Sequence, residues 1–376
     1  MDDLQRLRTR IDEIDARMID LFEQRMALSE QVAEYKRTHA QSVLQTGRED
    51  DVRAHAVECL RDKRLAPHAV EFVNAVMDVS KDYQHERLGH GLWRDGLARE
   101  TFDLHAPKGY FGAQGSNTEQ AMREFFGNSD GAIAYDKFED VFRAIDGGEI
   151  RYGVVPIENS STGAIDDVYD LLGKYDLYIV GEHWSRIRHC LWGVEGSTLD
   201  TVRDVYSHPQ GLAQCKAYVE RRGYTPHAYH DTAASAALVA AQTDVRKAAI
   251  AGECAGKRYG LSMLDRDIQT CGDNFTRFVV ISKTLTRDKG DKVGIRFGLY
   301  SASGTLFRAL RYFARYGINM IMLESRPVPE NPCNYWFYVD LEGSLQDDSM
   351  RQALGVLAEH TTSMRVLGEY RKGEWK

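Results

Sequence analysis

The chain has 376 residues, of which 43% are apolar and 28% charged, and its formal net charge at pH 7 is −8. This length supports two or three domains with cores of their own, and the composition is that of an ordinary soluble protein. The acidic balance and the lack of a long basic run argue against nucleic acid as the main partner. The 12 histidines lack metal-ligand spacing, so we expect no metal.

Cysteine usage and the chain start predict a cytoplasmic location. The six cysteines form no CxxC pair and no dense framework, which favours reduced thiols. The first four residues, Met-Asp-Asp-Leu, are acidic and lead into a charged helix, unlike a signal peptide. No uncharged apolar run reaches membrane-spanning length, so we expect no contact with a membrane.

An apolar stripe with spacings of three and four runs along the first forty residues. No Pro or Gly interrupts residues 3–40, which predicts one helix of roughly 50 Å at 1.5 Å per residue. The stripe consists of Leu4, Leu7, Ile11, Ile14, Met18, Leu21, Leu28, Val32 and Tyr35. Because such a helix exceeds the width of a small domain, we expect a second chain to cover the stripe.

Two cations lie on this apolar face. Arg25 stands between Leu21 and Leu28, and Lys36 follows three turns later on nearly the same face. A buried charge is costly unless something pairs with it. Either an acidic side chain of a neighbouring helix or an anionic ligand would satisfy these cations.

Two shorter helices follow, one from about residue 48 to residue 60 and one that starts near Pro67. The apolar stripe of the last helix turns polar at Ser80 and Gln84. We expect the three helices to form a mostly cationic pocket suited to a small dicarboxylate. Its expected members are Arg8, Arg25, Lys36, Arg48, Glu49, Ser80 and Gln84.

Residues 1–90 resemble the all-helical chorismate mutase that precedes other domains in fused aromatic amino-acid enzymes. The resemblance rests on Leu7-Arg8, the Ile-Asp-Glu-Ile-Asp run of residues 11–15, Arg25, Lys36, Arg48-Glu49, Ser80 and Gln84. It implies an intertwined helical dimer in which Arg8 serves the partner's pocket. Arg8 and Arg25 are turned roughly 100° from each other on one helix, which fits this division.

The resemblance also implies the role of each pocket residue. The rearrangement of chorismate to prephenate is unimolecular, so the site must hold the compact conformer and stabilise charge on the breaking ether oxygen. The arginines Arg8, Arg25 and Arg48 would take the carboxylates, and Lys36 and Gln84 would donate to the ether oxygen. Glu49 would accept from the ring hydroxyl. Gln45, where related bacterial enzymes carry an aspartate, is also expected to contact the substrate.

Residues 91–107 show neither a helical nor a strand-like spacing of apolar residues, and they are expected to be a linker. From residue 108, short apolar runs alternate with helical stretches, which is the pattern of an α/β domain. Several strand-to-helix turns rich in Ser, Thr, Asn and Gly would surround a cleft between two lobes. Such a cleft suits a ligand-binding protein as well as an enzyme. No G-x-G-x-x-G motif occurs, so we expect no nicotinamide cofactor.

The stretch from residue 152 to residue 172 predicts a strand, a polar turn and a helix. The strand would end at Pro156, which cannot donate to a sheet ladder. Ser, Thr and Asn side chains in residues 158–163 would cap the helix, whose N-terminus attracts anions. This pattern indicates either an ordinary capped turn or a seat for a small carboxylate.

A threonine between two phenylalanines closes this part of the chain. Alternation along the strand places Phe275 and Arg277 on one face and Thr276 on the other. On local pattern alone, a threonine between two phenylalanines is more often simple strand filler.

Residues 108–283 resemble prephenate dehydratase. Four motifs in this order carry the resemblance: Gly115-Ser116, Pro156 to Ser160, Ser207 to Gln210, and Asn274 to Phe278. It implies a two-lobed fold similar to periplasmic binding proteins, in which Thr276 stabilises the departing ring hydroxyl of prephenate. Because a threonine hydroxyl is a weak acid, we favour a hydrogen bond over full proton transfer. The substrate carboxylates would be oriented by Asn159, Ser160, Thr232 and Arg277.

The last segment follows a charged linker at residues 284–292 and predicts a ferredoxin-like βαββαβ order over residues 293–376. The Leu-Glu-Ser-Arg-Pro run of residues 323–327, placed after a dehydratase, resembles the ACT module that senses phenylalanine. The implied effector site comprises Gly304, Thr305, Leu306, Glu324, Ser325 and Arg326.

The sequence therefore predicts a cofactor-free fused chorismate mutase–prephenate dehydratase with phenylalanine control, at least dimeric. One alternative is a monofunctional dehydratase whose helical segment is only a dimerisation arm, and the presence of Arg8, Arg25, Lys36 and Gln84 argues against it. A second is a two-lobed amino-acid-binding regulator, which phenylpyruvate formation from added prephenate would exclude. A mutase–dehydrogenase fusion would need the dinucleotide motif that the sequence lacks.

Overall fold

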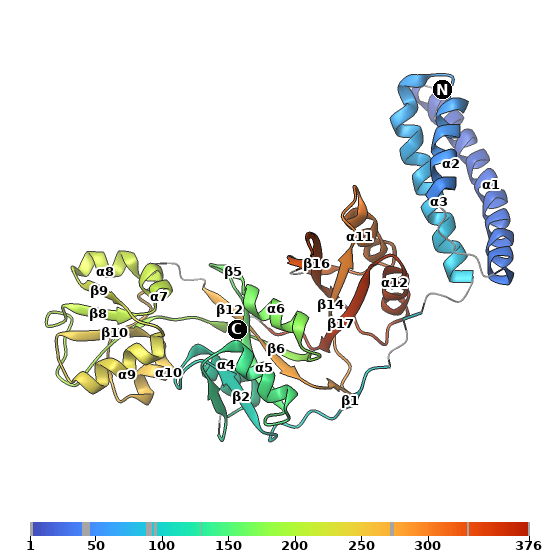
Figure 1. Cartoon of the computed structure of the whole chain (residues 1–376). Coiled ribbons are helices and arrows are strands. Elements are labelled where there is room, and N and C mark those ends of the chain that lie inside the picture. The colour runs from blue at the N-terminus through green and yellow to red at the C-terminus, as the bar shows by residue number, and fades with distance from the viewer. Residues whose placement is uncertain are drawn as a thin grey trace. The chain divides into compact units, whose positions relative to one another are not determined.

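The computed structural model describes residues 3–39, 46–87, 92–93, 96–128, 130–270, 274–328 and 331–374 (Figure 1). The chain divides into two compact units. The first comprises Met1–Arg94 and Asp348–His360, and the second comprises Asp95–Asp347 and Thr361–Lys376. Among the described residues, every helix is too short or too polar to pass through a lipid bilayer.

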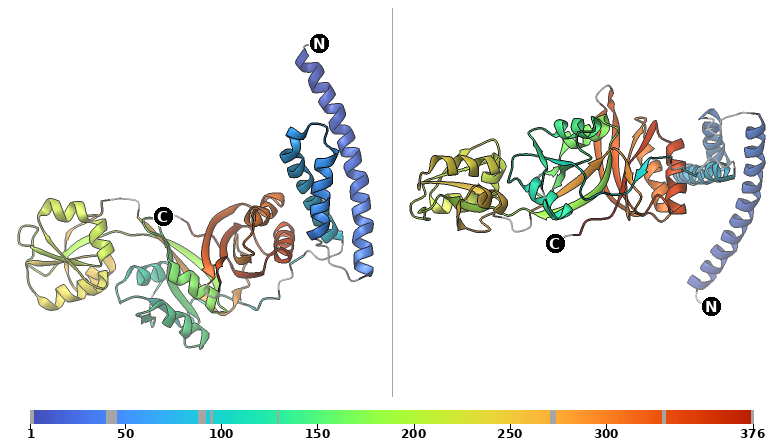
Figure 2. Two further views of the ribbon diagram at one scale, coloured as in Figure 1. Left: turned by 45° about the horizontal axis from the view of Figure 1, so that its top comes forward. Right: turned by 90° about the horizontal axis from the view of Figure 1, so that it is seen from below.

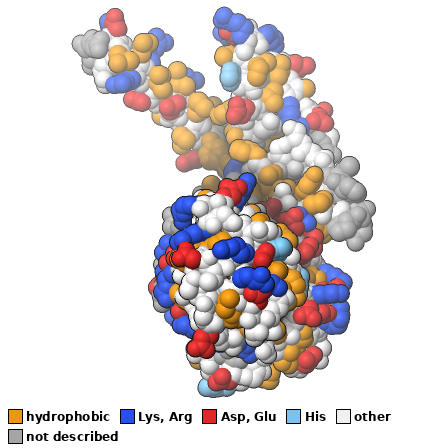
Figure 3. Space-filling view, turned by 90° about the vertical axis from the view of Figure 1, so that its left-hand side faces the viewer, with side chains coloured by type: hydrophobic (Ala, Val, Ile, Leu, Met, Phe, Trp, Pro, Cys, Tyr) orange, Lys and Arg blue, Asp and Glu red, His pale blue; other side chains and the backbone are white. Residues whose placement is uncertain are grey.

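The first unit is helical. Its elements are α1 (Asp3–Thr38), α2 (Thr46–Cys59), the short 3-10 helix η1 (Lys63–Leu65), α3 (Ala66–Arg87) and α12 (Asp348–Glu359). The expected long first helix is confirmed, and Figure 2 shows it as one uninterrupted rod. Its apolar stripe remains uncovered, since Leu7 is 60% and Leu21 61% exposed. Hydrophobic side chains accordingly mark the surface of the helical arm at the top of Figure 3.

The second unit begins with an α/β lobe. Its strands are β2 (Lys108–Phe111), β3 (Ile133–Tyr135), β4 (Tyr152–Asn159), β5 (Gly163–Ala164), β6 (Tyr178–Arg186) and β12 (Phe275–Ser282). Its helices are α4 (Asn117–Phe126), α5 (Phe138–Asp146) and α6 (Asp166–Lys174). β12 lies between β4 and β6 and is antiparallel to both, so its side chains face the buried layers on each side of the sheet.

A second lobe is inserted between β6 and β12. Its sheet has the order β11-β7-β10-β8-β9. The strands are β7 (Cys190–Gly193), β8 (Asp204–Ser207), β9 (Thr225–Ala228), β10 (Lys247–Ala251) and β11 (Ser262–Asp265). The helices are α7 (Pro209–Gln214), α8 (Lys216–Arg222), α9 (Thr232–Gln242) and α10 (Glu253–Arg258). The two chain crossings between the lobes are joined by a 2.8 Å hydrogen bond from Ile187 N to Asn274 O.

The C-terminal segment has the expected order of elements. It comprises β14 (Lys292–Leu299), α11 (Thr305–Arg315), β15 (Met320–Val328), β16 (Asn331–Glu342), α12 and β17 (Ser363–Tyr370). Its strands lie in the spatial order β15-β16-β14-β17, and β17 then pairs in parallel with β6 through Gly368 and Ile179. The C-terminal strands and the first lobe therefore share one sheet.

Two local expectations were wrong. The strand does not end at Pro156, because β4 continues to Asn159. Pro156 stands opposite Phe278 of β12, at the register shift between Arg277 and Phe278, and such an irregularity tolerates a residue without an N–H. Nor does the polar turn cap α6, whose N-cap is Ile165 without a side-chain hydrogen bond. The turn instead folds back as β5.

The two segments expected to be linkers meet each other. The short strand β1 (Arg99–Glu100) pairs in parallel with β13 (Leu285–Thr286). Arg99 also reaches the buried carboxylate of Glu369 on β17 at 2.8 Å. The polypeptide before and after the two lobes is thus fastened to the shared sheet.

Candidate active sites

A cavity of about 380 Å³ opens between the two lobes of the second unit. The first lobe contributes the ends of β2, β4 and β12, and the second lobe contributes the turns before α7 and α9. Side chains that line it include Ser116, Asn159, His189, Gln210, Thr232 and Thr276. The ring of polar turns expected from the sequence is therefore present and encloses space for a small ligand.

Thr276 and Asn159 form the buried centre of this cavity. The Asn159 Nδ2 donates to Thr276 Oγ1 at 2.7 Å and to Asn274 Oδ1 at 3.0 Å. Asn159 Oδ1 in turn accepts from Ser161 N at 3.0 Å. The Thr276 hydroxyl therefore accepts one hydrogen bond, and among the described residues no acceptor takes its own proton. This leaves the proton for a ligand, because a hydroxyl carries one donor.

Gln214 connects the two lobes beside this pair. Its Oε1 accepts from Asn274 Nδ2 at 3.2 Å and contacts His189 Nε2 at 2.7 Å. Its Nε2 donates to Ser161 Oγ at 3.0 Å. The amide thus links α7 of the second lobe with the loop after β4, and it holds the cavity wall in one arrangement.

Two helix N-termini supply backbone donors to the cavity. Ser116 caps α4 by accepting from Glu119 N at 3.3 Å, and Asn117 and Thr118 of its first turn line the cavity. Asp231 caps α9 by accepting from Ala234 N at 2.9 Å, which places Thr232 on the cavity wall. The partial positive charge of such helix ends attracts carboxylates.

The structure does not bring all four expected carboxylate-orienting residues to the cavity. Asn159 and Thr232 line it. Ser160 lies beside it, with its Oγ accepting from Phe275 N at 2.9 Å. Arg277 is on the opposite face of β12, only 2% exposed and surrounded by Glu182, Asp340 and Tyr370. Its assignment to substrate binding is therefore corrected, because the alternation of the strand points it away from Thr276.

In the first unit, two residues of the expected mutase pocket, Arg25 and Ser80, are in contact. Arg25 Nη1 donates to the Ser80 hydroxyl and, at 3.4 Å, to Val76 O, which joins α1 to α3. Burial lowers the pKa of Arg25. Among the described residues, no carboxylate pairs with this guanidinium. Of the two partners considered from the sequence, an anionic ligand therefore fits Arg25 better than an acidic neighbour.

A second group of charges lies where α1, α2 and α3 meet. Glu49 accepts from Lys81 at 2.7 Å and from Arg53 at 3.1 Å. Burial lowers the pKa of Lys36, and the positive charge of Lys81 lowers it further. Lys81 also pairs with Asp78 at 3.4 Å, and Arg53 also pairs with Asp50 at 2.6 Å, so each of these two cations has two acidic partners within the helical unit.

The remaining pocket residues are placed as follows. Gln84 is buried on α3, and its Oε1 has no hydrogen-bond partner within the described ranges. Arg48 is exposed at the start of α2. Arg8 is exposed on α1, about 26 Å from Arg25 at 1.5 Å per residue, so it does not share that residue's pocket in one chain. Gln45 lies outside the described residues.

The expected effector residues occupy two elements of the C-terminal segment. Gly304 is the N-cap of α11 with φ 76°, and Thr305 and Leu306 begin the helix. On β15, Glu324 and Arg326 share one face and Ser325 lies on the other. Arg326 pairs with Asp170 at 3.0 Å and also with Asp166, both on α6 of the first lobe.

Comparisons with known proteins match both parts of the chain. The prephenate dehydratase family model covers residues 109–286, and the chorismate mutase type II model covers residues 7–85. The bifunctional chorismate mutase/prephenate dehydratase of Aquifex aeolicus (strain VF5) is 32% identical over 379 residues, which span 99% of each chain. The chain belongs to the bifunctional chorismate mutase/prephenate dehydratase family. The Escherichia coli (strain K12) member is 33% identical over 97% of this chain and 95% of its own.

A solved structure extends the likeness to the fold of this family. The crystal structure of a prephenate dehydratase from Arthrobacter aurescens in complex with L-Phe superposes with a TM-score of 0.66 and 28% identity. It covers 71% of this chain and 90% of that chain. The two lobes thus have the architecture of a prephenate dehydratase.

Two cavity residues, His189 and Gln214, were not anticipated from the sequence. His189 is 3% exposed, and its Nδ1 has no hydrogen-bond partner among the described residues. Its Nε2 faces Gln214 Oε1, which only accepts, so the proton is on Nε2 and Nδ1 is an unused acceptor. No short motif marks these residues, because their role arises only where the two lobes meet.

His189 gives the fold a predicted acid sensitivity. Burial lowers the pKa of His189, and the hydrogen bond to Gln214 opposes this only in part. As the pH falls below about 6.5, His189 takes up a proton in the unfolded chain at a higher pH than in the folded chain. Protonation therefore favours the unfolded chain, and the free energy of unfolding decreases as the pH falls. Urea unfolding at pH 7.5 and pH 5.5 should therefore show a smaller pH difference for His189→Asn than for the wild type.

The exposed His105 provides the matched control. His105→Asn should keep the wild-type difference between the two pH values. If the stability difference between the two pH values were reduced equally in both variants, burial of His189 would not be its cause.

Proposed function

We propose that the chain converts chorismate to prephenate in the helical pocket and prephenate to phenylpyruvate in the two-lobed cavity. The observation that carries the second activity is the Thr276 hydroxyl, which accepts from Asn159 and keeps its own proton for a ligand. The first activity is supported by the half-buried Arg25, which has no carboxylate partner among the described residues. Neither reaction needs a cofactor.

The dehydratase step follows from the cavity geometry. Prephenate carboxylates would bind the N–H groups at the starts of α4 and α9, which places the ring against Thr276. Thr276 donates to the ring hydroxyl as it leaves with its bonding electrons while CO₂ departs and the ring becomes aromatic. The bond from Asn159 to Thr276 Oγ1 polarises the hydroxyl and makes it a stronger donor.

The mutase step needs positioning and charge. Arg25 and Arg48, with Arg8 of a second copy, would hold the two carboxylates so that the reacting carbons are close. Lys36 and Gln84 would donate to the ether oxygen as negative charge develops there. Glu49, Ser80 and Gln45 would contact the substrate hydroxyl and carboxylate groups.

We further propose that the chain is at least a dimer. The uncovered stripe of α1 and the position of Arg8, about 26 Å from Arg25 on the same helix, both support a second copy that covers the stripe and completes the pocket. β15 ends the shared sheet, which gives a second edge for association. The cytoplasmic location expected from the sequence remains a prediction.

The proposed domain limits are those expected from the sequence. They are mutase 1–90, linker 91–107, dehydratase 108–283, linker 284–292 and regulatory module 293–376. The strand order β15-β16-β14-β17 supports a ferredoxin-like ACT module. The L-Phe complex of the Arthrobacter aurescens enzyme supports phenylalanine as its ligand. Gly304, Thr305, Leu306, Glu324, Ser325 and Arg326 would form the effector site, at an interface between chains.

One assay tests the proposed function. Purified protein given chorismate without any added cofactor should form prephenate first and phenylpyruvate second, and added phenylalanine should slow the second step. Prephenate that accumulates without phenylpyruvate would refute the dehydratase. Phenylpyruvate formed only from added prephenate would refute the mutase and support a monofunctional dehydratase.

A further inference from the structure

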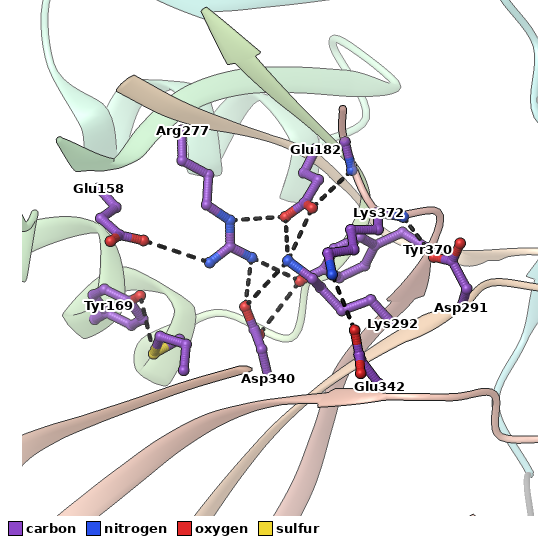
Figure 4. A network of polar contacts seen from close by, with 12 residues as sticks. Glu158, Tyr169, Glu182, Arg277, Asp291, Lys292, Asp340, Glu342, Tyr370 and Lys372 are labelled. Carbon is purple, nitrogen blue, oxygen red and sulfur yellow. Dashed lines mark hydrogen bonds and ion pairs between the residues drawn. The ribbon is translucent and has the colours of Figure 1, made fainter. Parts of the chain in front are cut away.

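A buried group of charges lies behind Thr276, on the far face of β12 (Figure 4). Arg277 Nε donates to Glu182 Oε2 at 2.8 Å, and its Nη2 donates to Asp340 Oδ2 at 2.6 Å. The same Nη2 donates to the hydroxyl of Tyr370 at 3.0 Å. The guanidinium is thus held by three hydrogen bonds, and its Nη1 also lies 3.9 Å from a carboxylate oxygen of Glu158 on β4.

Lys292 completes this group. Its Nζ lies 2.9 and 2.8 Å from the two oxygens of Glu182 and 3.8 Å from Asp340. Glu182 also accepts from Gly373 N at 2.8 Å. Burial alone raises the pKa of Glu182, but the charges of Arg277 and Lys292 outweigh burial and lower it. The group therefore holds two cations and two carboxylates, all buried.

The five residues come from two parts of the second unit. Arg277 on β12 and Glu182 on β6 belong to the first lobe, whereas Lys292, Asp340 and Tyr370 come from β14, β16 and β17. Separating the two parts would leave a buried charge without its partner, which is strongly unfavourable. The network therefore makes β12 and the C-terminal strands move together.

The backbones of β17 and β6 also approach each other closely where the two parts meet. Gly368 on β17 pairs with Ile179 on β6, and a Cβ added at Gly368 would lie 2.1 Å from Ile179 O. Only glycine permits this approach. The two parts are therefore in contact through their backbones as well as through the charged side chains.

Thr276 is the neighbour of Arg277 on β12. The ladder between β12 and β4 shifts register just after Arg277, where Arg277 pairs with Glu158 but Phe278 pairs with Pro156. A bulge interrupts the regular hydrogen bonds that would otherwise fix a strand. On its other side β12 stays in regular register with β6 across these residues, so the irregularity lies between the strands that carry Thr276 and Asn159, directly beside the hold on Arg277.

We propose that Arg277 is a positioning residue that ties the Thr276 hydroxyl to the C-terminal module, so that a ligand on that module alters dehydration through the buried network. This inference rests on the proposed function. Phenylalanine would favour one arrangement of β14, β16 and β17. The network transmits that preference to β12, and Thr276 then moves relative to Asn159 and the substrate.

The test uses full-length protein with Tyr370→Phe, which removes one hydroxyl from the network, and Lys292→Met, which removes one cation. Tyr218→Phe is the matched control, because its hydroxyl bonds Asp265 in the second lobe, away from the network. Two quantities are measured for each protein: the dissociation constant of phenylalanine, by calorimetry, and the residual dehydratase rate at saturating phenylalanine. Mutase activity and circular dichroism verify that each variant is folded.

In the wild type and Tyr218→Phe, saturating phenylalanine should depress the rate to the same extent. Tyr370→Phe and Lys292→Met should bind phenylalanine within about threefold of the wild-type affinity yet lose at least half of the inhibition, since coupling and binding are separate quantities. Arg277→Lys keeps the charge but not the three-point hold, so kcat should fall about tenfold or more with KM within about twofold.

Two results would overturn the inference: full inhibition in both network variants, or loss of phenylalanine binding in them. Unchanged kcat in folded Arg277→Lys would overturn the positioning role. A wild type that forms no phenylpyruvate, or that phenylalanine does not inhibit, would instead refute the proposed function.

Discussion

Replacing Thr276 by alanine is expected to lower kcat for phenylpyruvate formation by about 10²-fold or more, the scale of a lost donor to developing charge. The reason is geometric, because Asn159 occupies the acceptor side of the hydroxyl at 2.7 Å and leaves its proton for the departing group. The side chain is buried, so water does not easily replace it. Steady-state formation of phenylpyruvate from prephenate measures the effect.

Two further substitutions at this position separate the hydroxyl from the shape of the side chain. Thr276→Ser keeps the hydroxyl and should retain much more activity than Thr276→Ala. Thr276→Val keeps the shape and should behave like alanine. If serine and alanine variants had equal rates, the hydroxyl would have no role and Thr276 would only fill the strand.

Replacing Lys36 or Arg25 by alanine is expected to abolish chorismate turnover while prephenate dehydration continues. Loss of a cation aimed at developing negative charge raises the barrier by about 3 kcal/mol or more. The two reactions should separate because the pocket lies in the helical unit and the cavity lies in the other unit. Chorismate loss and phenylpyruvate formation from added prephenate are measured on the same preparation.

Arg17, exposed on α1, offers a matched control for removal of positive charge. Arg17→Ala should leave both activities near the wild-type values. Lys36→Ala is the cleaner of the two active-site variants, because Arg25 also joins α1 to α3 through Ser80 and Val76. Equal loss of both activities in a folded Lys36 variant would show that the sites are not independent.

Periodic features were predictable from the sequence. The length of α1 follows from uninterrupted apolar spacing without Pro or Gly, and the order of elements in the C-terminal segment follows from short alternating runs. The wrong predictions came from local sequence rules that the pairing of strands overrode. Pro156 does not end β4, because it lies at the register shift between β4 and β12, where a missing N–H is tolerated. The polar turn before α6 pairs with β4 instead of capping the helix.

The candidate dehydratase site was predictable from the sequence where its residues belong to a single motif. Strand alternation correctly placed Thr276 and Arg277 on opposite faces, yet membership of the same motif suggested a shared role. The partners of Arg277 lie 63 to 95 positions away in the sequence, and no local pattern reports them. The roles of His189 and Gln214 likewise arise only where the two lobes meet, so no pattern in the sequence indicates them.

The shared sheet has a consequence for how the chain is synthesised. The core of the first lobe joins Val155, Ile179 and Val279 with Leu367 and Tyr370 of β17, which follows the other strands of this sheet in the sequence. The lobe therefore cannot complete its core until β17 has left the ribosome, although most of its sequence emerges long before. Until the final strand arrives, Glu182 and Arg277 lack their C-terminal partners and the edge of β6 is open. The nascent chain thus exposes an open strand edge until β17 pairs with β6, which makes chaperone binding most valuable in that interval.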